Sequence, residues 1–329
     1  MESVQASFVR RALAVSAVVL IASGASLPAQ AMFPDRSVRI VVAFGVGGTT
    51  DVIARVIGQR LSELWHQSVV IENRPGASGN LAAVVVGQAS PDGYTLLLAT
   101  QSLAVNVTFL PSQQIDPMRH LDPITLVARA PSILIVPPNA PYRTLTELVA
   151  YSNLHPDELT YGSAGVGTIG HLGVELLKQQ TGLKATHVPY NAATTQAYAD
   201  VATGRLSLML PTIAGYIPQI KAGLFRALAV SGQTRLEALP EVPTFAEAGA
   251  PNYTAPSWYG LFAPRGAPPD VIAKLNADVR EVLSHPDVRA RCAEIGFDPI
   301  ASTPEELHTL LQHEIPKWAE ILQATQSTR

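Results

Sequence analysis

The chain has 329 residues, of which 47% are hydrophobic and 15% are charged, and its formal net charge is −3. This balance excludes a disordered chain, and the lack of a basic excess argues against nucleic acid as a partner. The length is sufficient for two domains with a sizeable core.

The first 31 residues have the pattern of a secretory signal peptide. Arg10 and Arg11 form a positively charged start, residues 12–21 form an apolar stretch, and Ala29-Gln30-Ala31 matches a cleavage site. The apolar stretch is shorter than the roughly 20 residues that span a bilayer, which disfavours a retained membrane anchor. We therefore expect export, cleavage after Ala31, and no membrane span in the mature chain.

A strand, a glycine-rich turn and a helix follow. The apolar run from Val38 to Phe44 predicts a strand buried on both faces of a parallel sheet. The turn Gly45–Gly48 contains three glycines, Thr49 or Thr50 offers a hydroxyl N-cap, and Asp51 lies in the first helical turn. The helix is expected to bury one face, made by Ile53, Ile57, Leu61 and Leu64.

This turn directs unpaired backbone N–H groups to one point, which is a geometry that binds anions. No lysine follows Gly48, so the turn is not a Walker A loop, and Thr50 occupies the position of the third glycine of a dinucleotide-binding fingerprint. Taken alone, the turn is equally compatible with a tight strand–helix connection that binds nothing.

The next elements continue the alternation of strands and helices. Strands are expected at residues 69–71 and 94–99, with a helix at residues 81–88 between them. This order predicts a doubly wound parallel sheet, and ligands of such sheets bind beyond the carboxyl ends of the strands. Gly45–Thr50 and Thr100–Ser102 both lie there, and Gln101 is a candidate binding residue. Residues 103–125 contain three prolines, and we expect an irregular surface crossover there.

The opening pattern returns about 120 residues later. Residues 159–161 form a short strand, Gly162–Thr168 is a second glycine-rich turn, and a helix is expected from Ile169 to about Gln180. Two such units in separate halves of the chain suggest two lobes, each presenting a helix N-terminus to a shared cleft. Further strands are expected at residues 185–188, 206–210, 226–230 and 258–263, with helices at residues 268–283, 286–295 and 304–324.

No catalytic or metal-binding constellation is evident. His171 and Glu175 lie four residues apart, but no second histidine shares their helix face, so we interpret His171 as a cleft-lining or capping residue. His187 is expected to be a hydrogen-bonded core residue. Nothing in the sequence identifies a base for Ser163, and the position of Asp51 is explained by the helix dipole.

Three further acidic or basic residues, Asp116, His120 and Asp122, are expected to be solvated in the crossover. The single cysteine, Cys292, cannot form an internal disulfide and is expected in or near the core. The sequence therefore predicts neither an enzyme nor a metal or cofactor site.

Seven ordered motifs resemble the Bug (TctC-like) periplasmic substrate-binding proteins of the tripartite tricarboxylate transporter system. They are I-E-N-R-P-G-A-S-G-N at 71–80, P-D-G-Y-T-L-L at 91–97, Y-G-S-A-G-V-G-T-I-G-H at 161–171, H-V-P-Y at 187–190, K-A-G-L-F-R-A-L-A-V at 221–230, V-P-T-F-A-E-A-G at 242–249 and S-W-Y-G-L-F-A-P at 257–264. They extend over essentially the whole chain from about Phe33 onward.

The resemblance implies an α/β protein with the two-lobed type II periplasmic binding fold and two hinge crossings. We expect the first lobe to comprise residues 33–125 and 263–329, and the second lobe to comprise residues 126–262. It further implies a periplasmic, monomeric receptor without cofactor. This receptor closes on a small di- or tricarboxylate or aromatic acid and delivers it to membrane permease subunits. A receptor coupled to a sensor would have the same binding site, so that alternative stays open.

Ligand contacts in the resembling family come largely from backbone N–H groups and bridging waters of the two glycine loops. Carried onto this chain, the expected binding residues are Phe44, Gly45, Val46, Gly47, Gly48, Thr49, Asp51, Gln101, Ser163, Ala164, Gly165, Gly167, Thr168, His171, Tyr190, Asn191 and Thr212.

Two departures from the family pattern affect the expected ligand. The first loop lacks the prolines usual in the family, which is expected to loosen it. Pro211 stands where family members often have an aspartate. Because no carboxylate is then available to pair with an ammonium group, we expect simple carboxylates to bind in preference to amino acids.

Overall fold

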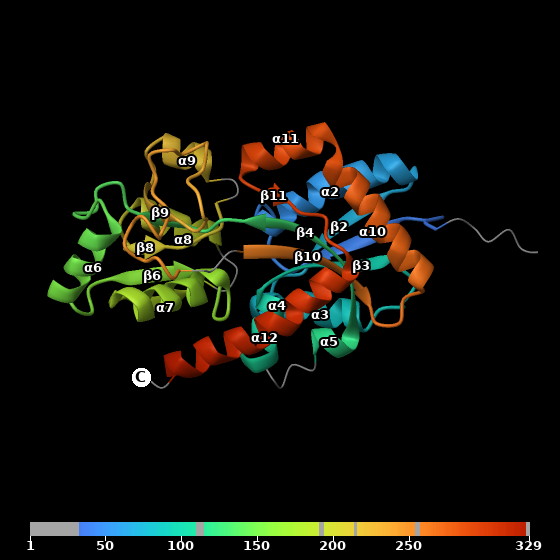
Figure 1. Cartoon of the computed structure of the whole chain (residues 1–329), viewed down its shortest axis with the longest axis horizontal. Helices are drawn as coiled ribbons and strands as arrows, with labels where there is room; N and C mark the ends of the chain where they lie inside the picture. The colour runs from blue at the N-terminus through green and yellow to red at the C-terminus, as the bar shows by residue number, and fades with distance from the viewer. Residues whose placement is uncertain (1–32, 110–114, 191–193, 214–215, 254–256, 327–329) are drawn as a thin grey trace, which may run out of the picture. The chain divides into compact units, whose positions relative to one another are not determined.

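The computed structural model describes residues 33–109, 115–190, 194–213, 216–253 and 257–326. The chain divides into residues 1–35 and a compact unit of residues 36–329, and the account below concerns the second unit. This unit contains two β-sheets, each flanked by helices, and Figure 1 shows the long strand β4 of the first sheet running toward the second sheet.

The first sheet has six strands in the order β11-β4-β10-β3-β1-β2. They are β1 (Val38–Val42), β2 (Val69–Asn73), β3 (Thr95–Thr100), β4 (Leu121–Ala130), β10 (Ser257–Pro264) and β11 (Asp298–Pro299). β2, β1 and β3 are parallel, whereas β10 is antiparallel to both β3 and β4. β11 at the edge is antiparallel to β4, so the sheet is mixed, and β10 and β11 run opposite to the other four strands.

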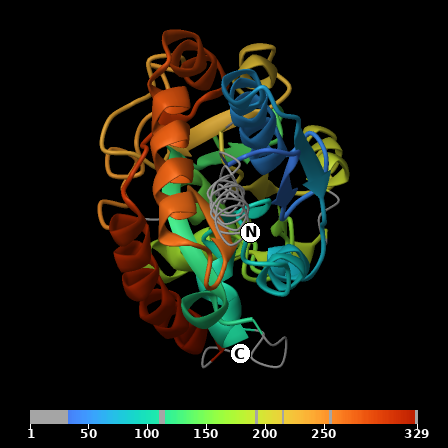
Figure 2. The ribbon, with the colours of Figure 1, turned by 90° about the vertical axis from the view of Figure 1, so that its right-hand side faces the viewer.

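Two helical layers cover this sheet. One layer contains α2 (Thr49–Trp65), α10 (Pro269–Ser284) and α11 (Pro286–Ile295), and α2 packs against α10. The other layer contains η1 (Ala77–Gly79), α3 (Asn80–Gly87), α4 (Ser102–Phe109), α5 (Pro117–His120) and α12 (Pro304–Gln326). Figure 1 shows the first layer above the sheet and the second below it, and Figure 2 shows α10 in orange and α12 in red from the side of the first sheet.

The second sheet has five strands in the order β7-β6-β8-β5-β9. They are β5 (Ile133–Val136), β6 (Thr160–Ser163), β7 (Thr186–Pro189), β8 (Leu208–Met209) and β9 (Arg226–Val230). β7, β6 and β8 are parallel, and β5 is antiparallel to its neighbours. The helices of this lobe are α6 (Leu145–Leu154), α7 (Ile169–Thr181), α8 (Thr194–Ala202) and α9 (Ile217–Lys221).

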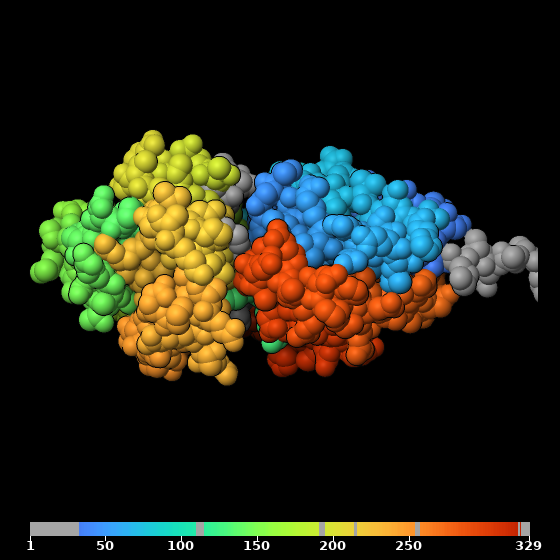
Figure 3. Space-filling view, turned by 90° about the horizontal axis from the view of Figure 1, so that it is seen from above, coloured from blue at the N-terminus to red at the C-terminus, as the bar shows by residue number. Residues whose placement is uncertain are grey.

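The predicted two-lobed α/β fold is confirmed, with both ends of the described chain in the first lobe and the middle in the second. Figure 3 shows this division, with the first lobe coloured blue and red and the second green to light orange. The predicted lobe boundaries at residues 125 and 262 fall inside strands, since β4 continues to Ala130 and pairs there with Ser257 of β10. We therefore propose boundaries after Ala130 and before Ser257.

The expected irregular crossover at residues 103–125 is wrong for the described part of this range, most of which belongs to α4, α5 and β4, whereas residues 110–114 lie outside the described residues. The prolines misled the prediction because Pro117 occupies the first turn of α5, behind the Asp116 cap, and Pro123 lies within β4. Asp122 is not simply solvated either, because it accepts hydrogen bonds from the backbone N–H groups of Gly266 and Ala267 and pairs with Arg265.

Two smaller expectations also need correction. The first strand ends at Val42, two residues earlier than expected, and Ala43 and Phe44 already belong to the bend that follows. On α2, Leu64 is 38% exposed, and Trp65 packs inward in its place. The buried indole N–H of Trp65 donates to Asp278 of α10, so it is not left unpaired.

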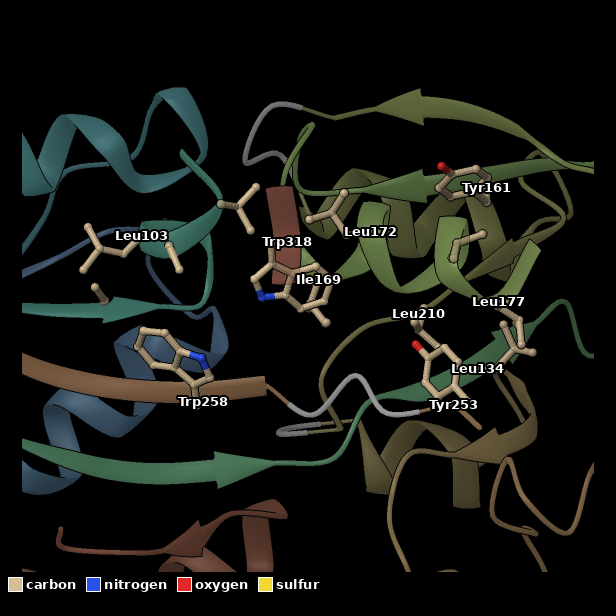
Figure 4. Close-up of a cluster of buried hydrophobic side chains, with 14 of the residues drawn as sticks. Leu103, Leu134, Tyr161, Ile169, Leu172, Leu177, Leu210, Tyr253, Trp258 and Trp318 are labelled. Atoms are coloured by element: carbon tan, nitrogen blue, oxygen red, sulfur yellow. The ribbon is translucent and has the colours of Figure 1, made fainter. Parts of the chain in front are cut away.

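A continuous apolar cluster links the two lobes. Trp318 of α12 is fully buried in the same cluster as Trp258 of β10 and Ile169 and Leu172 of α7. Figure 4 shows Trp318 beside Ile169, with Leu103 and Trp258 on its other side. The C-terminal helix of the first lobe is thereby held against the helix that begins at the second glycine loop.

A buried carboxylate fixes this arrangement. Glu314 of α12 is 8% exposed, and its Oε2 atom accepts hydrogen bonds from the indole N–H of Trp318 at 2.6 Å and of Trp258 at 3.3 Å. Lys317 donates to the other carboxylate oxygen at 3.0 Å. The charge of Glu314 is therefore fully partnered, and the two indoles are held in fixed orientations.

We predict that Glu314→Ala lowers the free energy of unfolding by about 2–4 kcal/mol, because it leaves two buried indole N–H groups unpaired. Glu314→Gln keeps an acceptor oxygen and should cost less. Urea unfolding measures both, and Glu320→Ala, an exposed change on the same helix, is the control. A cost for Glu314→Ala as small as that of Glu320→Ala would contradict the assignment.

Candidate functional site

A pocket lies where the carboxyl ends of four strands meet. The segments after β1 and β3 of the first sheet and after β6 and β8 of the second all line it, as do two residues at the start of β10. Its lining residues are Phe44, Gly45, Gly48, Thr49, Thr50, Thr100, Gln101, Ser102, Ser163, Ala164, Thr168, Ile169, Gly170, Tyr198, Met209, Leu210, Pro211, Thr212, Tyr216, Ser257 and Tyr259. Both lobes therefore contribute to one site, as the two glycine turns predicted.

The space open to the centres of water molecules in this pocket is about 110 Å³. Since one water needs about 10–15 Å³ of such space, the pocket holds several waters or one small organic molecule. A nucleotide or a polymer chain would not fit in this conformation.

The first glycine loop is shaped by hydrogen bonds to its backbone. Gly47 adopts a φ of +77°, which a glycine tolerates without strain, and its N–H donates to Asp51 at 2.9 Å. The side-chain amide of Asn73 donates to the carbonyl of Phe44. Gly48 is the N-cap of α2 and no side-chain hydroxyl caps the helix, so the expected cap by Thr49 or Thr50 is wrong. Both hydroxyl-bearing residues line the pocket instead.

Asp51 supports the loop from behind. It is 2% exposed, and Arg55 binds both of its carboxylate oxygens, at 2.9 and 3.0 Å. Burial alone would raise the pKa of Asp51, but hydrogen bonds from Arg55, the Gly47 N–H and Asn73 outweigh it and hold the pKa below its ordinary value. Asp51 thus carries a negative charge that Arg55 neutralises, and it does not line the pocket.

The second glycine loop is held from within by three side chains. Ser163 Oγ accepts the N–H of Gly165, Thr168 Oγ1 donates to the carbonyl of Gly165, and His171 Nδ1 accepts the N–H of Gly167. As at any helix start, the first N–H groups of α7 have no intrahelical acceptor. His171 is a capping residue, in agreement with one of the two roles expected for it.

Ser163 has a neighbour that the sequence did not indicate. Its Oγ lies 2.6 Å from Nε2 of His187, which comes from the adjacent strand β7 and is partly rather than fully buried. The ring of His187 stacks on that of Tyr161, with centroids 4.8 Å apart, and is tilted against that of His171, with centroids 4.3 Å apart. Because Ser163 is 1% exposed and also bonds to Gly165, we interpret the Ser163–His187 contact as support for the loop.

Two hydrogen bonds join the lobes. The hydroxyl groups of Thr49 and Thr212 lie 2.9 Å apart, one from each lobe. The hydroxyl of Ser78, next to α3, donates to the carbonyl of Val166 in the second glycine loop. Each bond joins a residue of one lobe to a loop of the other, so both would have to break for the lobes to separate.

Neutral hydroxyl groups dominate the polar lining. Tyr259 hydrogen-bonds to Thr49 and Thr212, and Tyr198 to Tyr216. Burial raises the pKa of Tyr216 to about 12, and it raises the pKa values of Tyr198 and Tyr259 as well. The tyrosines therefore remain protonated and can donate hydrogen bonds at any physiological pH.

The described lining residues include no Asp, Glu, Lys, Arg or His. The internal segments outside the description, residues 110–114, 191–193, 214–215 and 254–256, also contain none of these residue types in the sequence. The electrostatic character of the pocket is consequently set by hydroxyl dipoles and by the N-termini of α2, α4 and α7, which point partial positive charge at it.

Two buried hydroxyl groups in the pocket have no hydrogen-bond partner in the protein. They are Ser102 Oγ at the start of α4 and Ser257 Oγ at the start of β10, and the two residues are 2% and 1% exposed. A buried polar group without a partner costs free energy, so such a group indicates a bound water or ligand.

The predicted binding residues divide into three groups. Phe44, Gly45, Gly48, Thr49, Gln101, Ser163, Ala164, Thr168 and Thr212 line the pocket. Residues that lie outside the lining are Val46, Gly47, Asp51, Gly165, Gly167, His171 and Tyr190. Tyr190 turns toward α8 because its hydroxyl donates to Asp200 at 2.6 Å. Asn191 lies outside the described residues.

Other lining residues adjoin the expected binding residues. Thr50, Thr100 and Ser102 lie beyond the strand ends where the sequence places ligands, and Pro211 is the position at which the sequence departs from the family pattern. Ile169, Gly170, Met209 and Leu210 were missed, although they lie beside predicted residues or at a strand end. Tyr198, Tyr216, Ser257 and Tyr259 come from a helix, a loop and the start of an antiparallel strand, and no local sequence pattern marks their proximity to the pocket.

No group of histidine, cysteine or acidic side chains among the described residues is arranged to hold a metal ion. Within the same residues, no helix has the length and hydropathy required to cross a membrane.

Residues 53–326 match the model of the tripartite tricarboxylate transporter family receptor, TctC. A UPF0065 protein in the tcbD–tcbE intergenic region of Pseudomonas sp. strain P51 is 35% identical over 314 residues, which cover 95% of this chain and 93% of that protein. Protein BugT of Bordetella pertussis is 32% identical over 318 residues, which cover 96% and 97% of the two chains.

Three solved structures share the fold closely. The periplasmic binding protein BugD is 29% identical with a TM-score of 0.84, and 89% of this chain and 99% of that chain are covered. Rpa4515 of R. palustris with adipate is 36% identical with a TM-score of 0.84, over 89% and 98% of the chains. MatC of Rhodopseudomonas palustris with bound malate is 34% identical with a TM-score of 0.82, over 88% and 99%.

We predict that Asp51→Asn lowers the free energy of unfolding by about 1 kcal/mol at pH 7. Because the folded state lowers the pKa of Asp51 below its ordinary value of 3.8, the carboxylate stabilises the protein above that pH. This stabilisation is lost as the pH falls through the lowered pKa, so the difference between the two proteins should shrink below pH 4.

Urea unfolding at pH 7 and at pH 3 measures this difference. Asp270→Asn, at an exposed position in the first turn of α10, is the matched control. A difference for Asp51→Asn that stays constant across this range would disprove the linkage.

Proposed function

The chain belongs to the tripartite tricarboxylate transporter family of receptors, and from this premise we propose that it is a periplasmic receptor that binds a small carboxylate between its lobes and delivers it to membrane permease subunits. The pocket is the proposed binding site. In this proposal the protein catalyses no reaction, and hinge closure converts binding into a shape that the permease accepts.

The observation that carries the proposal is the convergence of helix N-termini on a pocket without charged side chains. Backbone N–H groups at helix starts stabilise anions, and a low-dielectric pocket strengthens that interaction. A cation would find no carboxylate among the described lining residues, and the tyrosine hydroxyls cannot supply negative charge because their pKa values are raised.

Amino acids are disfavoured ligands in this proposal. Pro211 lines the pocket beside Thr212 and offers no acceptor from its side chain for an ammonium group. The two relatives whose structures are described with adipate and malate agree with a carboxylate ligand.

The proposed site of action follows from the N-terminal segment and the relatives. Residues 1–31 have the pattern of a signal peptide, and the related BugD is a periplasmic binding protein. We propose cleavage after Ala31, which N-terminal sequencing of the protein recovered from the periplasm would test directly.

A second role, as the ligand-binding partner of a sensor, uses the same pocket. Deleting the gene distinguishes the two roles. Loss of uptake of a radiolabelled ligand supports transport, whereas normal uptake with loss of a ligand-dependent transcriptional response supports sensing.

We predict that a carboxylate from a panel of aliphatic, hydroxylated and aromatic acids stabilises the mature protein. A ligand at 100 times its Kd adds about 2.7 kcal/mol to the free energy of unfolding, which thermal unfolding detects readily. The protein is first unfolded and refolded to remove any resident ligand. Stabilisation by nucleotides or amines but by no carboxylate would overturn the proposal.

We further predict that Ala164→Trp abolishes this stabilisation, because an indole at this lining position fills the pocket. Val46→Trp is the matched control, since Val46 lies on the other glycine loop, is 75% exposed and does not line the pocket. Equal ligand responses of the two variants would show that the carboxylate binds elsewhere.

A further inference from the structure

We infer that a group of residues outside the pocket forms a latch that slows release of the ligand from the closed lobes. The latch consists of Ser78 and Asn106 of the first lobe and Val166 and Gly167 of the second, and none of them is among the lining residues. The inference rests on the proposed function and deepens it, because it assigns part of the ligand affinity to contacts that do not touch the ligand.

Ser78 belongs to a sequence motif that contributes nothing to the pocket lining. The motif I-E-N-R-P-G-A-S-G-N covers residues 71–80, none of which is among the lining residues. Its last part, η1, nevertheless contacts both glycine loops. A Cβ atom on Gly79 would lie 3.0 Å from Cβ of Ala43, which directly precedes the first loop. The hydroxyl of Ser78 donates to the carbonyl of Val166 in the second loop. The motif therefore joins the two loops from outside the pocket.

The backbone of η1 has an unusual conformation. Ala77 and Ser78 have φ angles of +46° and +52°, in the left-handed region that residues with a side chain rarely occupy. Such backbone persists only where the surrounding contacts hold it, and it is concentrated at ligand clamps and switch regions. Here the side-chain amide of Asn106 donates to the carbonyl of Ser78 at 3.3 Å. Helix α4 thus holds Ser78 in position for its bond to the second lobe.

The second lobe meets α4 through a glycine. Gly167 has a φ of +83°, and a Cβ atom there would lie 3.2 Å from Cγ1 of Val105 and 3.7 Å from Oδ1 of Asn106. The backbone of the second glycine loop therefore lies directly on α4, with no side chain between them. Since the two surfaces belong to different lobes, an opening movement at this point separates them. The latch forms only when the lobes are closed.

The latch also contains a group that favours opening. Asn106 is 3% exposed, and its Oδ1 atom has no hydrogen-bond partner among the described residues. A buried acceptor without a partner costs free energy, and opening of the lobes would let water reach it. The bond from Ser78 holds the lobes together, whereas the unpaired oxygen of Asn106 opposes it. A contact balanced in this way slows release of the ligand without preventing it.

A contact of the closed arrangement alone raises ligand affinity from a distance. The ligand is proposed to bind between the lobes, so any free energy that favours closure adds to its apparent affinity. The net contribution of one neutral hydrogen bond corresponds to a change of about three- to tenfold in an equilibrium constant. This change is expected in the dissociation rate, because the lobes must open before the ligand leaves, whereas association begins with the lobes open.

Ser78→Ala tests the latch in the refolded mature protein. The probes are adipate and malate, the acids described with two relatives. Calorimetry should show about three- to tenfold weaker binding of each acid, and stopped-flow measurements should show a matching increase in the dissociation rate with an unchanged association rate. Ser90→Ala, at an exposed serine of the same lobe, is the matched control. An affinity and dissociation rate of Ser78→Ala equal to those of Ser90→Ala would overturn the inference.

The ratio of the two affinities separates a latch from a ligand contact. Because Ser78 is proposed to touch neither acid, Ser78→Ala should weaken adipate and malate by the same factor. A changed ratio would show that Ser78 acts on the ligand itself, which contradicts the inference. If neither acid binds the unaltered chain, the two panel acids that stabilise it most become the probes. Binding of no carboxylate at all would overturn the proposed function, and with it this inference.

Hydrogen exchange on the unaltered chain gives an answer that does not depend on the folding of a variant. Saturating ligand should slow amide exchange of residues 77–80 by roughly threefold or more, although they do not line the pocket. Exchange in the turn at residues 90–93, in the same lobe, should stay unchanged. Equal exchange of residues 77–80 with and without ligand would show that closure does not engage the latch.

Discussion

The direction of the parallel strands is the constraint on which this site depends. Strands β1, β3, β6 and β8 all end at the pocket, and helices α2, α4 and α7 begin there. In a strand–turn–helix unit, the strand's carboxyl end and the helix N-terminus are necessarily adjacent. When two such sheets face each other along these edges, the pocket between them is rich in backbone N–H groups. Its described lining residues include no lysine or arginine.

The charged residues of the helices that follow the two glycine loops pair with each other and do not line the pocket. Asp51 binds the N–H of Gly47 and is neutralised by Arg55, and Glu175 accepts hydrogen bonds from Tyr161 and Lys178 behind the second loop. Both arrangements keep formal charge out of the lining. The affinity for an anion then depends on preorganised dipoles, which lose little free energy of reorganisation on binding.

The two lobes are joined by apolar packing between α12 and α7 and by a hydrogen bond between hydroxyl groups at the pocket. Trp318, Ile169 and Leu172 belong to a continuous apolar cluster that joins α12 to α7, whereas Thr49 and Thr212 meet through hydroxyl groups at the pocket. Apolar packing is non-directional and remains favourable through small movements. A single hydrogen bond between two hydroxyl groups is worth only about 1 kcal/mol and breaks readily. The Thr49–Thr212 contact at the pocket is therefore weaker than the apolar contact between α12 and α7.

The sequence by itself determined the class of fold, the two strand–turn–helix units and the identity of the family. The fold class and the two units depend on hydrophobic periodicity and on glycine positions, which are local properties of the chain. The family was indicated by the resemblance of seven ordered motifs, which are local as well. The sequence also located much of the candidate site, including Thr49, Gln101 and Thr168, because strand ends can be predicted from the same local pattern.

Only the tertiary structure decided which side chains face the pocket. Tyr259 and Ser257 reach it because β10 runs antiparallel to β3, so that the start of one strand lies beside the end of the other. His187 contacts Ser163 because β6 and β7 are paired in register. Asp51 and His171 turn away from the pocket to bind loop N–H groups. These placements depend on contacts between residues distant in the sequence, which no local pattern records.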